Sequence, residues 1–199
     1  PGGIMLSEFE TETPTALSRG EQPVFFNRIR DSLRQVEDDY DIVLIDCPPQ
    51  LGYLTMAAVC ASTSLLMTII PGRVDLASAS QFLTMASGVL EVLYSNGGIG
   101  AYDNFAYLLT RFDTAISTQQ DLSEWLRQLL GDSVIKTPFV KSSAVSEAGL
   151  SQKTIFEVDL ATTKNRKTYE RALESVMSFS NDIEKMIQSA WGRGGTNEA

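Results

Sequence analysis

The 199-residue sequence contains no histidine and only two cysteines. Without histidine, the chain has no internal base for a Ser-His-Asp or Cys-His nucleophile and no histidine ligand for zinc. Cys47 and Cys60 are thirteen positions apart and form no Cys-x-x-Cys pair, so a disulfide framework is absent and a reducing compartment is indicated. We expect both thiols to be small, buried apolar groups.

Long apolar runs are also missing. No stretch approaches the ~20 residues of a membrane span, and the first ten residues lack the basic start and apolar core of a secretion signal. Hydrophobic residues make up 43% and charged residues 21% of the chain, which is typical of a globular protein. We therefore predict a cytoplasmic protein with no membrane contact.

Charge is unevenly spread along the chain, whose net charge is −9. Residues 1–50 carry four arginines against ten acidic residues, whereas residues 136–171 carry seven lysines and arginines against four acidic residues. A locally basic surface on an acidic protein can follow nucleic-acid phosphates. The same charges can equally form a solvated face, and charge alone leaves both interpretations open.

Three short segments, at residues 42–45, 65–70 and 105–109, are apolar at nearly every position. Because they do not alternate between apolar and polar residues, they predict strands buried on both faces, as in a parallel sheet. Helical spacing around them predicts crossover helices. The expected helices lie at about 25–40, 81–94 and 121–130, with a further strand at 134–140 that Pro138 weakens.

A long amphipathic helix is expected at the end of the chain. Apolar residues recur at every third or fourth position from about residue 165 to Trp191, and the small polar residues at 192–199 are typical of a flexible tail. We predict an α/β fold with a doubly wound, mainly parallel sheet and this long C-terminal helix. Residues 1–191 would then belong to a single domain and 192–199 to the tail.

The segment most informative about chemistry is DIVLIDCPP, at residues 41–49. An apolar strand that ends in Asp46 places a carboxylate at the carboxyl edge of the sheet, where open α/β folds bind ligands. Such a carboxylate suits magnesium held through water beside nucleotide phosphates. An acidic turn after a strand is also common without any ligand, and it is the two following prolines that make the pattern more specific.

This segment resembles the Walker B motif of the ParA/MinD family of deviant Walker ATPases. The resemblance continues through LLMTIIPGRVDLASASQFL, YLLTRFD and VKSSAVSEAGLSQKTIFEV to the terminal helix, and the pattern is similar to the RepA partition proteins of RepABC plasmids. It implies a P-loop NTPase-like protein that binds ATP and Mg²⁺, dimerises and binds nucleoid DNA without sequence preference. It also implies hydrolysis stimulated by a ParB-like centromere-binding partner, and autorepression of the operon.

The resemblance also assigns residues. Asp46 matches the magnesium-positioning acid and Pro71 a proline at the mouth of the nucleotide cleft, while Thr110 and Arg111 fall where the family approaches the base. Lys141 matches a basic position implicated in DNA contact. Charge and helical spacing add further residues to the predicted DNA surface, namely Lys164, Arg166, Lys167 and Arg171.

One part that the resemblance requires is not in this sequence. The family's glycine-rich loop with two lysines should lie well before the Walker B segment. The glycines at 97–100 follow a helix and precede a strand, the reverse of a phosphate-binding order, and the tail at 192–196 has no lysine. We therefore expect a C-terminal portion, with the loop encoded upstream, that is inactive alone.

Two other interpretations stay open. The first is a truncated, non-enzymatic module that binds DNA and a partner. The second is a different enzyme on the same fold, since doubly wound sheets carry many activities. The second is disfavoured because no nucleophile–histidine pair can form, although carboxylate and lysine chemistry stay open.

Overall fold

A computed structural model describes residue 19 and residues 27–48, 52–72, 77, 80–81, 84, 87–88, 91, 102–159 and 165–194. The chain divides into two compact units, one of residues 1–65 and 80–102 and the other of residues 66–79 and 103–199. Each unit has packing of its own. The expectation of a single domain over 1–191 stays a prediction.

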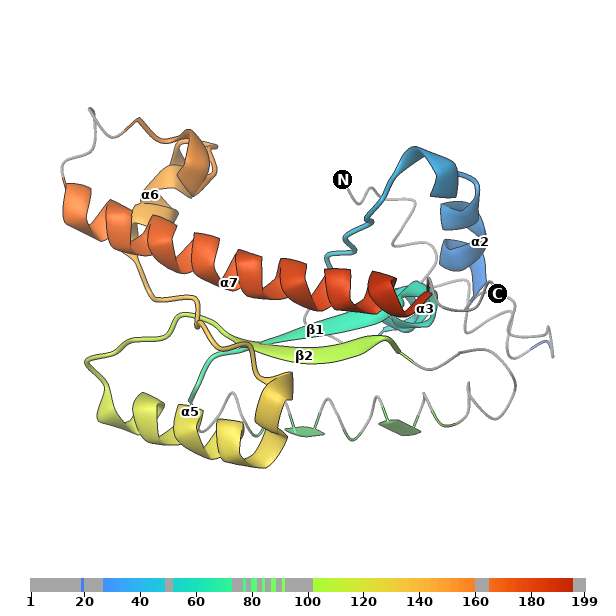
Figure 1. Ribbon diagram of the computed structural model, residues 1–199, viewed down its shortest axis with the longest axis horizontal. Coiled ribbons are helices and arrows are strands. Elements are labelled where there is room, and N and C mark those ends of the chain that lie inside the picture. Colours follow the sequence, from blue (N-terminus) through green and yellow to red (C-terminus); the bar gives the residue numbers. More distant parts are fainter. Residues whose placement is uncertain are drawn as a thin grey trace. The chain divides into compact units, whose positions relative to one another are not determined.

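The described residues form both helices and strands, as expected for an α/β protein (Figure 1). In chain order, with η for a 3-10 turn, they are α2 (Arg28–Arg34), η2 (Glu37–Asp39), α3 (Tyr53–Ala61), β1 (Ser64–Ile69), β2 (Asn104–Leu109), α5 (Ser117–Leu130), η3 (Gly131–Ser133), α6 (Ser143–Leu150), η4 (Ile155–Glu157) and α7 (Arg166–Gly194). The predicted fold class is confirmed, because β1 and β2 pair in parallel and a long helix ends the chain.

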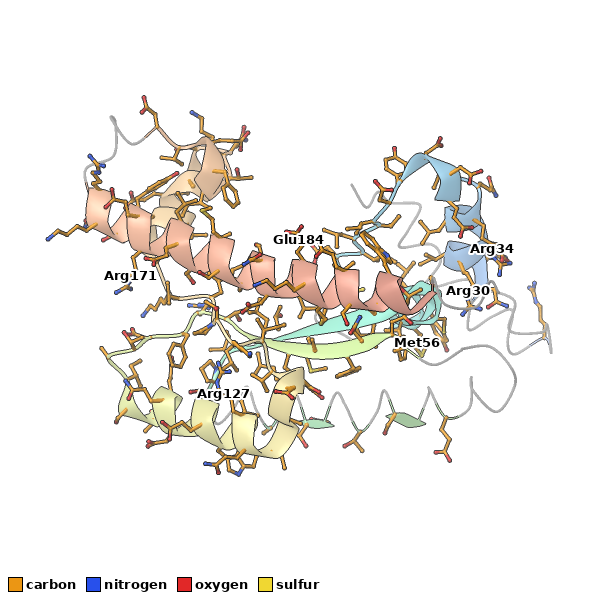
Figure 2. All side chains as sticks on the ribbon, in the orientation of Figure 1. Arg30, Arg34, Met56, Arg127, Arg171 and Glu184 are labelled. Carbon is orange, nitrogen blue, oxygen red and sulfur yellow. The ribbon has the colours of Figure 1, made fainter. Side chains whose placement is uncertain are left out.

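In the first unit, side chains satisfy the carbonyl end of α3. The last carbonyls of a helix have no partner within the helix. The Arg30 guanidinium of α2 (labelled in Figure 2) donates to the carbonyl of Cys60, 3.1 Å from its Nε, and the Tyr102 hydroxyl donates to the carbonyl of Val59 at 3.0 Å. A cation at this end also complements the helix dipole. Cys60 is buried, as predicted.

The strand predicted at residues 42–45 is not formed. Residues 42–48 have no regular secondary structure, and the four apolar side chains are exposed, from 37% at Ile45 to 88% at Leu44. A strand exists through pairing with a neighbour, and no described strand pairs with this segment. The apolar pattern shows that these side chains could be buried, but burial in a sheet requires a neighbouring strand. Cys47, also expected to be buried, is exposed with it.

In the second unit, β2 is the centre of packing. Its last four residues are buried, because α7 lies on one side of the strand and α5 on the other (Figure 1). The cluster on the α7 side consists of Ala106, Leu108, Ile135, Phe179, Ile183 and Met186. β1 has β2 as its one described neighbour, and its Leu66 is 42% exposed. The predicted burial on both faces is therefore found for β2 but not for β1.

The strand predicted at 134–140 is present only as an interrupted extension of the sheet. Val134 pairs with Tyr107 and Val140 pairs with Phe112, both in parallel and both as isolated bridges. Pro138 has no N–H to donate, so a continuous ladder cannot form across it. The prediction is thus corrected from a strand to two isolated bridges.

The predicted helices are found with shifted ends. α2 covers only the middle of the helix expected at about 25–40, of which residues 25 and 26 lie outside the described residues. α5 begins four residues before the expected start at Asp121 and ends at Gly131, as predicted. Gly131 has a φ of 57°, which glycine adopts without steric cost. In the helix expected at 81–94, the described residues 81, 84, 87, 88 and 91 are helical.

A second core in this unit joins α6, η4 and the first half of α7. Its buried members are Ala144, Ile155, Tyr169 and Ala172. The Tyr169 hydroxyl donates to the carbonyl of Ile155. η4 is capped by Thr154 and Glu157, whose carboxylate accepts from the Thr154 N–H and hydroxyl, each at 2.8 Å. These two hydrogen bonds lower the pKa of Glu157.

α7 is longer than predicted. It continues to Gly194, three residues past the expected end at Trp191, and residues 195–199 of the expected tail lie outside the described residues. Neither α7 nor another helix in the described part of the chain combines the length and the apolar character needed to cross a membrane.

Candidate nucleotide edge and nucleic-acid interface

The carboxyl ends of β1 and β2 bring Pro71 and Thr110 together. The Thr110 N–H donates to the carbonyl of Ile69, the last residue of β1, at 2.8 Å. Pro71 is fully buried and follows in a tight turn, in which the Gly72 N–H donates to the Ile70 carbonyl at 2.7 Å. Parallel sheets bind ligands outside the carboxyl ends of their strands, so two of the predicted nucleotide-site residues share the chemically expected edge.

Arg111 follows Thr110 in an unusual backbone conformation. Its φ is 51°, in the left-handed region that residues other than glycine adopt infrequently. The chain then continues into Phe112, whose N–H donates to the carbonyl of Phe139 at 3.0 Å, while the Arg111 side chain is exposed. Backbone strain of this kind gathers at ligand-binding positions, which supports the predicted role of Arg111.

Asp46 lies in the first unit, within the irregular segment 42–48, and is exposed. Among the described residues, no group of three or more cysteine, aspartate and glutamate side chains is arranged to hold a metal ion. A single carboxylate nonetheless fits Mg²⁺, which keeps several waters and takes one or two carboxylates together with nucleotide phosphates. Asp46 can supply one such carboxylate, with water and phosphate as the remaining ligands.

The backbone and the side chain of Lys141 both have partners. Its N–H donates to the carbonyl of Phe112 at 2.9 Å, and its own carbonyl accepts from Nη2 of Arg171 on α7 (Figure 2) at 3.3 Å. Its ammonium lies 3.7 Å from Oδ2 of Asp113, with 61% of the lysine side chain exposed. Asp113 is fixed in turn, because its other oxygen accepts from the Ala115 N–H at 3.1 Å. The structure thus brings two predicted DNA-surface residues, Lys141 and Arg171, together.

Two more predicted DNA-surface residues lie in the first turn of α7. Arg166 and Lys167 are exposed, and Nε of Arg166 donates to a carboxylate oxygen of Glu170 at 2.6 Å, which raises the Arg166 pKa. The first turn holds no acidic residue. Cations at a helix N-terminus oppose the helix dipole, although the pair that Arg166 forms with Glu170, four residues later, favours the helix. Lys164 lies outside the described residues.

Two groups that contact Lys141 or the residues just before it are missed by sequence reasoning, namely Asp113 and Ser175. Asp113 pairs with Lys141 across 28 positions of sequence. No pattern of neighbouring residues predicts a pair at that separation. Ser175 is buried on α7, with Ala172 before it and Phe179 after it on the same side of the helix. A polar residue within an apolar helical row is the signal that could have identified Ser175.

Comparisons with known proteins bear on what this edge and this surface do. Residues 1–96 match a family described as an AAA domain. The chain is 41% identical over 195 residues to the "Putative replication protein A" of Rhizobium rhizogenes, covering 97% of this chain and 48% of that protein. It is 26% identical over 195 residues to protein SopA of Escherichia coli (strain K12), covering 96% of this chain and 49% of SopA. Identity to the chromosome-partitioning ATPase Soj of Treponema pallidum is 26% over 153 residues, covering 75% of this chain and 57% of Soj.

The chain therefore resembles ParA-like proteins over nearly its whole length. The resemblance predicted from the Walker B-like segment and its continuation is thereby confirmed. This ParA-like chain spans about half the length of the curated relatives it matches. The AAA-domain match includes Asp46 and Pro71 and ends before Thr110, so the magnesium side of the predicted site lies inside the matched region and the base side outside it.

Proposed function

We propose that the chain is part of a ParA-type ATPase that segregates plasmid DNA. The observation that carries the proposal is the alignment to a replication protein through 97% of the chain, together with the similarity to the chromosome-partitioning ATPase Soj. In this proposal the complete protein binds ATP and Mg²⁺, dimerises, and binds DNA without sequence preference. It would work in the cytoplasm on the nucleoid, respond to a ParB-like centromere-binding partner and repress its own operon.

The nucleotide site of this proposal lies at the carboxyl edge of the sheet. Pro71 would lie at the mouth of the nucleotide cleft, Thr110 and Arg111 would approach the base, and Asp46 would hold Mg²⁺ through water. In P-loop proteins, backbone N–H groups and a lysine of the glycine-rich loop carry most of the phosphate affinity, and that loop would come from outside these 199 residues. We therefore expect this chain alone to bind ATP weakly at most and not to hydrolyse it.

The DNA surface of this proposal combines the first turns of α7 with the connection that carries Lys141. Its members are Lys141, Lys164, Arg166, Lys167 and Arg171. Their charge and the positive end of the α7 dipole both attract phosphate, whereas that same dipole disfavours cations in the first turn. This placement favours an anionic partner over a merely solvated face.

A non-enzymatic module that binds DNA and a partner is the second candidate, favoured by the lack of a glycine-rich phosphate loop in the 199 residues. ATP hydrolysis by the complete protein separates the two candidates. A folded complete protein with no magnesium-dependent hydrolysis, and with no change after Asp46→Asn, would favour the module.

The DNA surface is tested by measuring duplex binding of the complete, ATP-loaded protein across a salt series. Each phosphate contact contributes about 0.9 to the slope of log affinity against log salt, so Lys141→Ala/Lys167→Ala should weaken binding and lower the slope by about two. Lys185→Ala is the matched control, because Lys185 is an exposed lysine on the same helix, about five turns beyond Lys167. Equal affinities and slopes for the double variant and the wild type would show that the surface lies elsewhere.

A further inference from the structure

The connection between α5 and α6, residues 131–142, makes backbone hydrogen bonds both to the sheet and to α7. Toward the sheet, the Phe139 N–H donates to the carbonyl of Leu109 at 2.8 Å, and the Lys141 N–H donates to the carbonyl of Phe112 at 2.9 Å. The Phe139 carbonyl also accepts from the Phe112 N–H at 3.0 Å, whereas the Thr137 N–H, the Pro138 carbonyl and the Val140 N–H bond to side chains of α7. Buried backbone groups require partners, and α7 supplies them.

Ser175 is the centre of the α7 contact. Its hydroxyl donates to the carbonyl of Pro138 at 2.9 Å and accepts from the Val140 N–H at 3.1 Å, so one side chain uses both its donor and its acceptor capacity. Ser175 is 6% exposed. A serine inside a helix commonly bonds back to the carbonyl four residues earlier, whereas this one joins residues more than thirty positions away.

Two more side chains of α7 bond to the same connection. A carboxylate oxygen of Asp182 accepts from the Thr137 N–H at 3.3 Å, and the Arg171 guanidinium donates to the carbonyl of Lys141 at 3.3 Å. Arg171 and Ser175 are four residues apart and Asp182 follows seven later, spacings that place all three on one side of the helix. The backbone on both sides of the Lys141 Cα is therefore bonded, through its N–H to the sheet and through its carbonyl to α7.

We propose that Ser175 and Arg171 are positioning residues for the DNA contact of Lys141, an inference that rests on the DNA surface of the proposed function. A lysine side chain is a flexible stem that carries a point charge, and ordering it on a partner costs conformational entropy. A backbone fixed by Ser175 limits that cost to the side chain itself. Arg171 contributes by holding the carbonyl of Lys141, in addition to its own place on the proposed DNA surface.

The test is a double-mutant cycle on duplex DNA binding by the complete, ATP-loaded protein, with Ser175→Ala, Lys141→Ala and both together. Ser175→Ala should weaken binding about three- to tenfold, the range expected when one net hydrogen bond is lost. The double variant should bind no more weakly than Lys141→Ala alone, since the two residues act through one contact. Ser175→Thr keeps a hydroxyl at this position and should restore binding.

The outcomes separate the two levels of the proposal. If Lys141→Ala weakens binding but Ser175→Ala matches the wild type, or if the two losses add, the positioning role is wrong and the DNA surface stands. If Lys141→Ala leaves affinity and salt slope unchanged, the DNA surface fails at Lys141, and the positioning role fails with it.

Arg171 keeps the proposal testable if Ser175→Ala does not fold. Arg171→Lys retains the charge that the DNA surface requires but not the guanidinium bond to the Lys141 carbonyl, so it should weaken binding and leave the salt slope unchanged. An equal loss of affinity from Arg171→Lys in a Lys141→Ala background would overturn its positioning role.

Discussion

Cys47 and Cys60 carry the same side chain in opposite surroundings. Cys60 is 2% exposed, and burial raises its pKa to about 11. Cys47 is an exposed residue, although partial desolvation of its thiol and the neighbouring Asp46 carboxylate raise its pKa. Since the thiolate is the nucleophilic form, accessibility distinguishes the two thiols and the charge of Asp46 tunes the reactive one.

A disulfide reagent such as DTNB should therefore modify one thiol in the folded chain and both in urea. Cys47 should be the one that reacts without urea, and Cys47→Ser should abolish that phase. Asp46→Asn should accelerate it at mildly alkaline pH, because removal of a negative charge lowers the Cys47 pKa and raises the thiolate fraction. The release of the coloured thiol measures the rate, and a slower reaction in Asp46→Asn would contradict this account.

The elements themselves show what a single sequence can predict. The apolar run of β2 and the periodicity of α5 and α7 predict real elements, because those patterns are local. Residues 42–45 have the same apolar pattern but no strand, since pairing depends on a neighbour that the run does not encode. α6 is missed because little besides its N-cap marks it, where the Ala144 N–H donates to the Ser142 hydroxyl at 3.2 Å.

The candidate site follows the same division. Asp46, Pro71 and Lys141 are predicted from motifs that extend over a few adjacent residues. Ser175 acts through a contact with Pro138 that spans 37 positions. No pattern of neighbouring residues predicts a contact at that separation. Pro138 predicts where the strand is interrupted, but not which helix replaces the missing bonds.

The hydrogen bond between Tyr169 of α7 and Ile155 of η4 leads to a stability prediction. Tyr169 is 3% exposed, and Tyr169→Phe would leave the Ile155 carbonyl without its donor. We expect the free energy of unfolding to fall by about 1–3 kcal/mol, the cost of leaving a buried acceptor unsatisfied. Urea denaturation measures the change, with Tyr40→Phe as control because Tyr40 is 65% exposed. Equal losses in the two variants would show that the Tyr169 hydroxyl contributes nothing specific.

Over the whole molecule, the exposed apolar residues are not evenly spread. In the described part of the chain, residues 42–45 form the longest run of exposed large apolar side chains. Leu150 on α6, by contrast, has no exposed large apolar residue next to it in the sequence. Single exposed leucines are ordinary on protein surfaces, whereas an unpaired apolar segment is a template on which another chain can add a strand.

The chain alone should therefore self-associate through residues 42–45. Leu44→Lys should reduce association seen by light scattering or sedimentation, and Leu150→Lys should not, although the two leucines are 88% and 87% exposed. Both substitutions should change stability by less than about 0.5 kcal/mol, as is usual at exposed positions. Equal effects of the two lysines on association would show that general solubility, and not this segment, controls it.

The bonds between α7 and the connection before α6 also have a kinetic consequence. An amide proton exchanges with solvent only after its hydrogen bond has opened. The Val140 N–H is bound to a side chain of α7, while the Phe139 N–H next to it is bound to β2. Deuterium uptake at two adjacent amides would therefore report on two different openings, detachment of the helix at Val140 and detachment from the strand at Phe139.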